Sequence, residues 1–195
     1  MSVGESPVNT LSVQSPEVAI AQKTLRQVCR EVQAEGWVFN TETEYELVLD
    51  SSNHAVIPNN VLQIDLNHFK HADDFNVVRK KSGSVYKLYD LYEHRFNFED
   101  TNDGKLYCDI IWMVDFEEIP QVFKDYITAK ASRIASTRMI NDTKTVQLLV
   151  PEETMTRALA VEYDTRQADY NVFNDQQFRT NSGNVYRPYK VLQRR

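Results

Sequence analysis

The chain has 195 residues, of which 42% are hydrophobic and 26% charged, and its formal net charge is −6. This length fits one domain, or a domain with a small insertion, and it suffices to bury a sizeable core. We expect no membrane insertion and no secretory signal, because no apolar run approaches the roughly 20 residues of a spanning helix and the first 15 residues lack a basic segment followed by an apolar one.

A first helix is predicted over residues 16–35. Ser15 is a good N-cap residue, Pro16 suits the first helical position, and Gly36 is a favourable C-terminal stop. Apolar residues recur at steps of three and four, which gives a narrow stripe suited to packing against other helices. The stripe consists of Val18, Ala21, Leu25, Val28 and Val32.

The periodicity changes over residues 37–116, which predicts an antiparallel, meander-like β region inserted between helices. The candidate strands are 45–49, 56–58, 61–66, 75–80, 84–89, 95–98 and 105–113. Two turns are predicted to close hairpins, at Lys81-Ser82-Gly83 and at Asn102-Asp103-Gly104. The second is the stronger signal, because Asp-Gly tolerates positive φ. It would pair strands 95–98 and 105–113.

A second long helix is predicted after Glu118. Pro120 lies near its first turn, where the missing N–H does little harm, and Asn141-Asp142 marks its end. The stripe of this helix is interrupted by Lys130 alone. Its apolar members are Ile119, Val122, Phe123, Tyr126, Ile127 and Ile134.

A third helix is predicted after Pro151, which we expect to break or restart a short segment at 146–150. Glu152 and Glu153 suit the positive end of a new helix. Its expected apolar face consists of Met155, Leu159, Tyr163 and Tyr170.

The nearest approach to a metal-binding cluster consists of His68, His71, Asp73 and Asp74. These residues lie among strand candidates and lack the helical His pair with glutamate of zinc hydrolases, so a polar loop is favoured. Residues 99–104 are similar to the start of a calcium loop. Its twelfth position would be Ile110, which has no oxygen to offer, and this favours a hairpin turn.

The sequence lacks the glycine-rich loops of nucleotide-binding proteins and the Gly-x-Ser-x-Gly element of hydrolases. Cys29 and Cys108 are far apart and are expected to be reduced, partly buried thiols. No catalytic site can be assembled from these residues, so we expect no enzymatic activity, no cofactor and no bound metal.

Charge is unevenly distributed along the chain. Residues 171–195 hold five basic side chains against one acidic, a net charge of +4, whereas residues 1–170 hold 17 basic and 27 acidic ones, a net charge of −10. A solvated, disordered terminus is one interpretation. Its aromatic residues favour the other, an extended arm that docks on an acidic surface. The interface candidates are Phe173, Phe178, Arg179, Tyr186, Arg187, Tyr189, Lys190, Arg194 and Arg195.

Three segments, 4–11, 31–40 and 115–133, occur in an order and spacing typical of a known family. The first contains Gly-Glu-Ser-Pro-Val and the second ends in Gly-Trp-Val-Phe-Asn. The third runs from Asp-Phe-Glu-Glu-Ile-Pro into the second predicted helix. Together with 161–163 and 169–171 they resemble tail tubular protein A, the head-to-tail adaptor family of short-tailed phages. Ser6 departs from the family pattern, which has a second proline there.

The resemblance implies a virion structural protein at the head-tail interface and not an enzyme. It implies an α-helical bundle with a β insertion, and a dodecameric ring that joins the portal protein to the tail nozzle protein. Tail fibres would dock on the ring, and DNA would pass through its channel without specific binding. We therefore expect an α+β fold divided into an antiparallel bundle of three main helices (1–36 and 117–170), an inserted β-meander (37–116) and an extended C-terminal arm (171–195).

Two alternatives remain open. A tail fibre or receptor-binding protein would expose a large β surface and form trimers. An intracellular enzyme would have a deep pocket with clustered acids and a perturbed pKa. The acidic body also suggests a hypothesis for the channel, since negative walls would repel DNA and let it slide.

Overall fold

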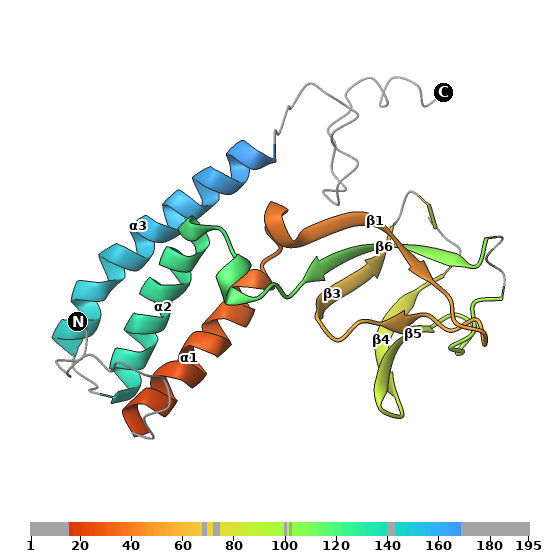
Figure 1. The fold of residues 1–195 in the computed structure, drawn as a ribbon, viewed down its shortest axis with the longest axis horizontal. Coiled ribbons are helices and arrows are strands. Elements are labelled where there is room, and N and C mark those ends of the chain that lie inside the picture. The colour runs from red at the N-terminus through yellow and green to blue at the C-terminus, as the bar shows by residue number, and fades with distance from the viewer. Residues whose placement is uncertain are drawn as a thin grey trace, which may run out of the picture.

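The computed structural model describes residues 16–67, 70–71, 75–99, 101, 103–139 and 143–168. Within these ranges lie three α-helices, two short 3-10 helices and six β-strands, so the predicted mixed α+β class is confirmed. Figure 1 shows the helices gathered in one part of the molecule and the strands in the other. In chain order the elements are α1 (Pro16–Gln33), η1 (Val38–Asn40), β1 (Thr41–Val48), β2 (Val56–Ile57), β3 (Val61–Leu66), β4 (Val77–Ser82), β5 (Val85–Asp90), β6 (Lys105–Trp112), η2 (Phe116–Glu118), α2 (Gln121–Met139) and α3 (Thr143–Gln167).

The strands form two antiparallel sheets of three strands each, ordered β1-β6-β3 and β2-β5-β4. β6 comes last in the chain yet lies at the centre of its sheet. This position suits its side chains, because Leu106, Cys108 and Ile110 are all fully buried. A meander would pair each strand with the next along the chain. Among the described strands only β4 and β5 do so, and the predicted meander order is therefore wrong.

The predicted hairpin between 95–98 and 105–113 is also wrong. β6 pairs with β1 on one edge and with β3 on the other, which leaves no edge for a further strand. Isolated bridges take the place of the hairpin, Asp90 with Arg95 and His54 with Asn97. The glycine of the turn still has its expected role. Gly104 has a φ of 67°, and its carbonyl accepts a hydrogen bond from Leu49 N–H at 3.1 Å, where β6 begins alongside β1.

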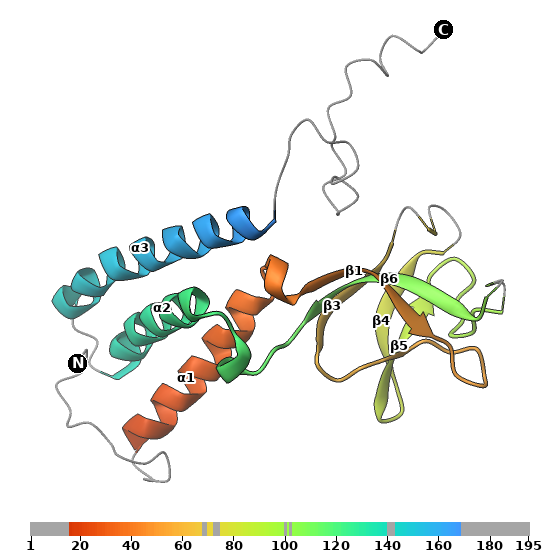
Figure 2. The ribbon, with the colours of Figure 1, turned by 45° about the horizontal axis from the view of Figure 1, so that its top comes forward.

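The other predicted hairpin is confirmed. Ser82 pairs with Val85 across a tight turn at Gly83, whose φ of 63° lies in the region that favours glycine. Both views show the ends of β4 and β5 extending from the body of the sheets (Figures 1 and 2).

The limits of α1 and α2 follow from local signals. α1 ends at Gln33, and Gly36 follows with a φ of 77°, a left-handed conformation that stops helices. α2 begins directly after Pro120, whose carbonyl accepts hydrogen bonds from Phe123 N–H at 3.0 Å and Lys124 N–H at 3.2 Å. Both predicted helices are confirmed.

α3 differs from its prediction in two respects. It continues unbroken through Pro151, which leaves the Gln147 carbonyl without its helical donor. Both residues are exposed, so water can hydrate that carbonyl. The predicted apolar face is rotated, because Met155 and Leu159 are exposed while Ala160 is fully buried. Tyr170, the last residue of the predicted face, lies outside the described residues.

The apolar side chains form two cores, one in each part of the molecule. The helical core contains Val28, Val32, Trp37, Ile119, Phe123, Tyr126, Ile127 and Ala160. The β core contains Leu47, Ala55, Ile57, Val61, Leu88, Phe98, Leu106, Cys108 and Ile110. In the helical part α2 packs against both α1 and α3, as Figure 2 shows.

Candidate interaction surfaces

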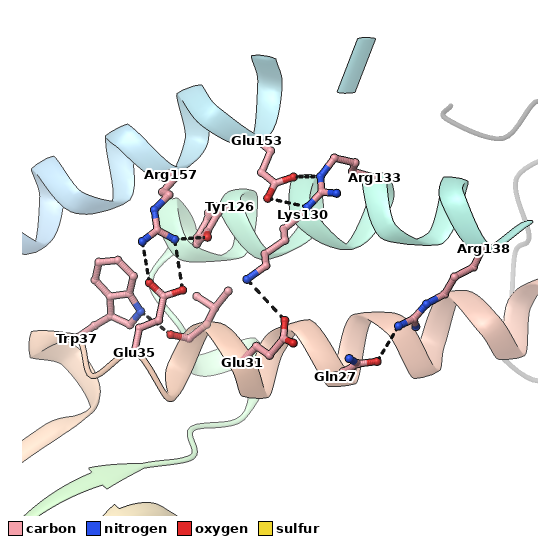
Figure 3. Close-up of polar contacts among 11 residues, drawn as sticks. Gln27, Glu31, Glu35, Trp37, Tyr126, Lys130, Arg133, Arg138, Glu153 and Arg157 are labelled. Atoms are coloured by element: carbon pink, nitrogen blue, oxygen red, sulfur yellow. Dashed lines mark hydrogen bonds and ion pairs between the residues drawn. The ribbon is translucent and has the colours of Figure 1, made fainter. Parts of the chain in front are cut away.

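Polar side chains join α2 to α1 beside their apolar core (Figure 3). Lys130, the residue that interrupts the apolar stripe of α2, lies 3.6 Å from the Glu31 carboxylate. At the second-to-last residue of α2, Arg138 donates to Thr24 Oγ1 at 2.8 Å and to Gln27 Oε1 at 3.0 Å. From Lys130 to Arg138 the partners step back along α1 from Glu31 to Gln27 and Thr24, so the two helices run antiparallel.

A second set of contacts joins α2 to α3 (Figure 3). Arg133 forms a two-bond ion pair with Glu153. Arg157 donates to the Tyr126 hydroxyl at 2.7 Å and lies 3.1 Å from the carboxylate of Glu35, just beyond α1. The hydrogen bond with Tyr126 raises the pKa of Arg157. Arg157 thus links α3 to α2 and to the turn that follows α1.

Two of the segments that carry the family resemblance meet in space. Trp37 and Phe39, from the Gly-Trp-Val-Phe-Asn segment, both pack on Phe123 of α2, with ring centroids 4.8 and 4.7 Å apart. The indole N–H of Trp37 donates to the Val32 carbonyl at 2.6 Å and anchors the ring against the end of α1. Tyr163 of α3 approaches the other side of Phe123, at 6.0 Å. These aromatic residues hold together the C-terminal end of α1, the N-terminal end of α2 and the C-terminal part of α3.

Buried amides join the helical part to the β part. Asn40 donates through Nδ2 to the carbonyls of Gln33 and Trp112, each at 2.9 Å, and accepts through Oδ1 from Trp37 N–H at 3.0 Å. Gln33 bonds in both directions with the backbone of Val114. All side-chain polar atoms of Gln33 and Asn40 therefore have partners, as buried polar groups require. This junction fixes where α1 meets the ends of β1 and β6.

α3 presents apolar side chains that no described residue covers. Leu148 is 79% exposed, Met155 66% and Leu159 46%. At about 100° per residue, these three and the exposed Glu152 and Glu162 fall within about 80° of arc. We call these five residues the α3 stripe. Val150 and Val161, also exposed, lie on the opposite flank of the helix.

The β4–β5 hairpin is a second exposed surface, which sequence reasoning did not single out. It carries three successive cations, Arg79, Lys80 and Lys81. Arg79 lies over the Tyr86 ring at 4.2 Å and donates to the Val61 carbonyl at 2.8 Å. Lys80 lies over the Tyr89 ring at 3.9 Å. Two of the three cations thus contact tyrosine rings of the same hairpin. The basic and tyrosine residues that lie close together over 79–89 are the sequence pattern that could have indicated this surface.

The structure brings together few of the residues singled out from the sequence. His71 accepts a hydrogen bond from Tyr107 N–H at 3.0 Å and its ring stacks on Tyr107, while His68, Asp73 and Asp74 lie outside the described residues. In the part of the chain that the structure describes, no group of three or more His, Cys, Asp or Glu residues is placed to hold a metal ion. The interface candidates of 171–195 all lie outside it.

The two cysteines are buried and unpaired, as predicted. Burial raises the pKa of Cys108 to about 12, so its thiol stays protonated at neutral pH. Among the described helices, none has the length and apolar character to cross a membrane.

The comparison with known families gives a single result. The family model described as tail tubular protein matches residues 1–170, which include both segments that meet around Phe123. No curated protein matches the chain. The chain therefore belongs to the tail tubular protein family and is a structural component of the phage virion tail.

Proposed function

We propose that the protein is a head-to-tail adaptor, which forms a dodecameric ring between the portal protein and the tail nozzle protein. Tail fibres dock on this ring, and DNA passes through its channel during ejection. The family match over residues 1–170 supports the tail assignment, and the adaptor role is the finer step that we propose.

The observation that carries the proposal is the exposed apolar surface of α3. When two copies meet, burying an exposed side chain such as Leu148 or Met155 stabilises the contact. The contribution is about 1.5–3 kcal/mol for a side chain that becomes fully buried. A contact between two different patches on identical copies closes into a ring when the rotation between copies is suitable. α2 packs against both α1 and α3, so α3 is one of two outer helices, and its exposed side is well placed to make such a contact.

The charge of the body supports the channel proposal. Residues 1–170 carry a net charge of −10, whereas strong binding to DNA phosphates requires lysine and arginine. An acidic channel wall would let DNA slide without sticking. Binding of duplex DNA by the assembled ring, measured at several salt concentrations, tests this. We expect weak binding at low salt, and tight binding that weakens steeply with salt would contradict it.

Assembly on the cognate portal tests the adaptor role directly. We expect the purified full-length protein, mixed with portal, to give dodecameric rings by electron microscopy. Free protein can remain monomeric, since the portal acts as template. Portal that stays bare under these conditions would overturn the proposal.

A tail fibre or receptor-binding protein is the alternative function. It would form trimers through a large β surface, whereas each described sheet has three strands. Native mass spectrometry separates the two functions, because a fibre protein would form a stable trimer without portal.

A further inference from the structure

We propose that the α3 stripe is the docking site for residues 171–195 of a neighbouring copy. The proposal rests on the adaptor ring and goes beyond it by naming the two surfaces that meet. One is the apolar and acidic flank of α3, and the other is the aromatic and basic end of the chain.

The first argument is the exposure of the stripe. Leu148, Met155 and Leu159 line one side of α3 over about three helical turns, and all three remain at least 46% exposed. The side of α3 that faces α2 is occupied instead by Ala160 and by the ion pairs of Glu153 and Arg157. Packing among the described residues therefore leaves this apolar row available for another segment.

The second argument is chemical complementarity. The stripe combines apolar side chains with the carboxylates of Glu152 and Glu162, of which Glu162 also forms an exposed ion pair with Arg166 of the same helix. Residues 171–195 alternate aromatic residues with cations and carry a net charge of +4. Aromatic and arginine side chains are the anchors that interfaces use most. Opposite charges around them select the partner and its register.

The third argument concerns length and connection. The stripe spans 15 residues of helix, about 21 Å from first to last, whereas 25 extended residues reach about 80 Å. The segment begins four residues after α3 ends at Gln167, so it can leave its own helix and cross to the next copy. An arm that fills a stripe on the next copy is a contact between two different patches. Such contacts close a ring in which every stripe is filled.

Cross-linking between copies tests the proposal. One preparation of full-length protein carries Met155→Cys and another carries Tyr186→Cys, and the two are mixed, assembled on portal and treated with a short bismaleimide. The native Cys29 and Cys108 are 4% and 0% exposed, so they are shielded from the reagent. We expect covalent dimers that contain one copy of each variant.

Val161→Cys is the matched control, because Val161 is apolar, 43% exposed and on the opposite flank of α3. We expect its yield of mixed dimers to be at least fivefold below that of Met155→Cys. Equal yields would overturn the proposal. A chain that carries both Met155→Cys and Tyr186→Cys and cross-links only within itself would also overturn the proposal, since the arm would then dock on its own helix.

A second experiment measures assembly by the Leu148→Ser and Met155→Ser variants and by a chain truncated after residue 170. We expect each to raise at least tenfold the concentration needed for ring formation, and combining truncation with Met155→Ser to add little. Circular dichroism shows whether each variant remains folded. Failure of wild-type protein to form rings would refute the adaptor role. Wild-type rings together with unaffected variants would refute this inference alone.

Discussion

The Gln33 side chain and the Val114 backbone form a two-bond pair. Gln33 Nε2 donates to the Val114 carbonyl at 2.9 Å, and Val114 N–H donates to Gln33 Oε1 at 2.7 Å. Gln33 is the last residue of α1 and is fully buried, while Val114 follows the end of β6. The pair therefore imitates one step of a β ladder and joins the helical part to the central strand of a sheet.

Gln33→Ala should lower the free energy of unfolding by about 1–3 kcal/mol, because it leaves the partly buried N–H and carbonyl of Val114 without their side-chain partners. Urea unfolding monitored by circular dichroism measures the change. Gln63→Ala is the control, since Gln63 is an exposed residue of β3, and we expect a change below about 0.5 kcal/mol there. Equal effects of the two substitutions would show that Gln33 does not hold the junction.

Tyr126→Phe tests the contact through which Arg157 links α3 to α2. It removes the hydroxyl that accepts from Arg157, and we expect a loss of about 0.5–1.5 kcal/mol. A double-mutant cycle with Arg157→Met should give a coupling energy of similar size. Arg166→Met, which breaks an exposed pair with Glu162, should change stability by less than about 0.5 kcal/mol. A coupling energy near zero would mean that Arg157 acts through Glu35 alone.

Alanine substitutions at two glycines with similar φ angles distinguish the cost of backbone strain from the cost of steric contact. Gly36 and Gly83 have φ of 77° and 63°, but a Cβ at Gly36 would lie 2.9 Å from Ile111 Cδ1, whereas one at Gly83 would have no neighbour within 4 Å. Gly83→Ala should therefore destabilise by about 1 kcal/mol, from backbone strain alone. Gly36→Ala should destabilise by somewhat more, about 1–2 kcal/mol, since Ile111 Cδ1, at the end of a flexible side chain, must also shift to admit the Cβ. Thermal unfolding in which the order is reversed would contradict this.

Local signals predicted the helix ends well. Pro16, Gly36 and Pro120 each act through their own backbone conformation, so neighbouring sequence suffices to predict them. The order of the sheets could not be predicted in this way. β1 and β6 pair across about 60 residues of chain, and several apolar strands were equally suitable partners for β6.

The face of α3 could not be predicted because its inward side is largely polar. Glu153 and Arg157 turn toward α2, where Arg133 and Tyr126 receive them, and Ala160 supplies the apolar contact. Apolar periodicity alone selects Met155 and Leu159 as the buried side. In the structure the side of α3 that meets α2 carries Ala160, so Met155 and Leu159 remain exposed.

Asp164 gives a test by pH. Burial raises the pKa of this carboxyl above its ordinary 3.8, and the hydrogen bond from Val38 N–H, at 2.8 Å, offsets this only in part. The folded state therefore binds this proton more tightly than the unfolded state. Its contribution to stability is greatest below the ordinary pKa and is lost as the pH rises through the raised one.

Asp164→Asn retains the acceptor for Val38 N–H and removes the charge. We expect the variant to be more stable than the wild type at pH 7, by less than about 1 kcal/mol because the side chain is partly solvated, and to lose this advantage at pH 3. Urea unfolding at both pH values measures the difference. Asp125→Asn, at an exposed position of α2, is the control and should show no such gain. The opposite result would be a stability difference between variant and wild type that is less favourable to the variant at pH 7 than at pH 3. It would mean that the charged carboxylate strengthens the link between α3 and η1.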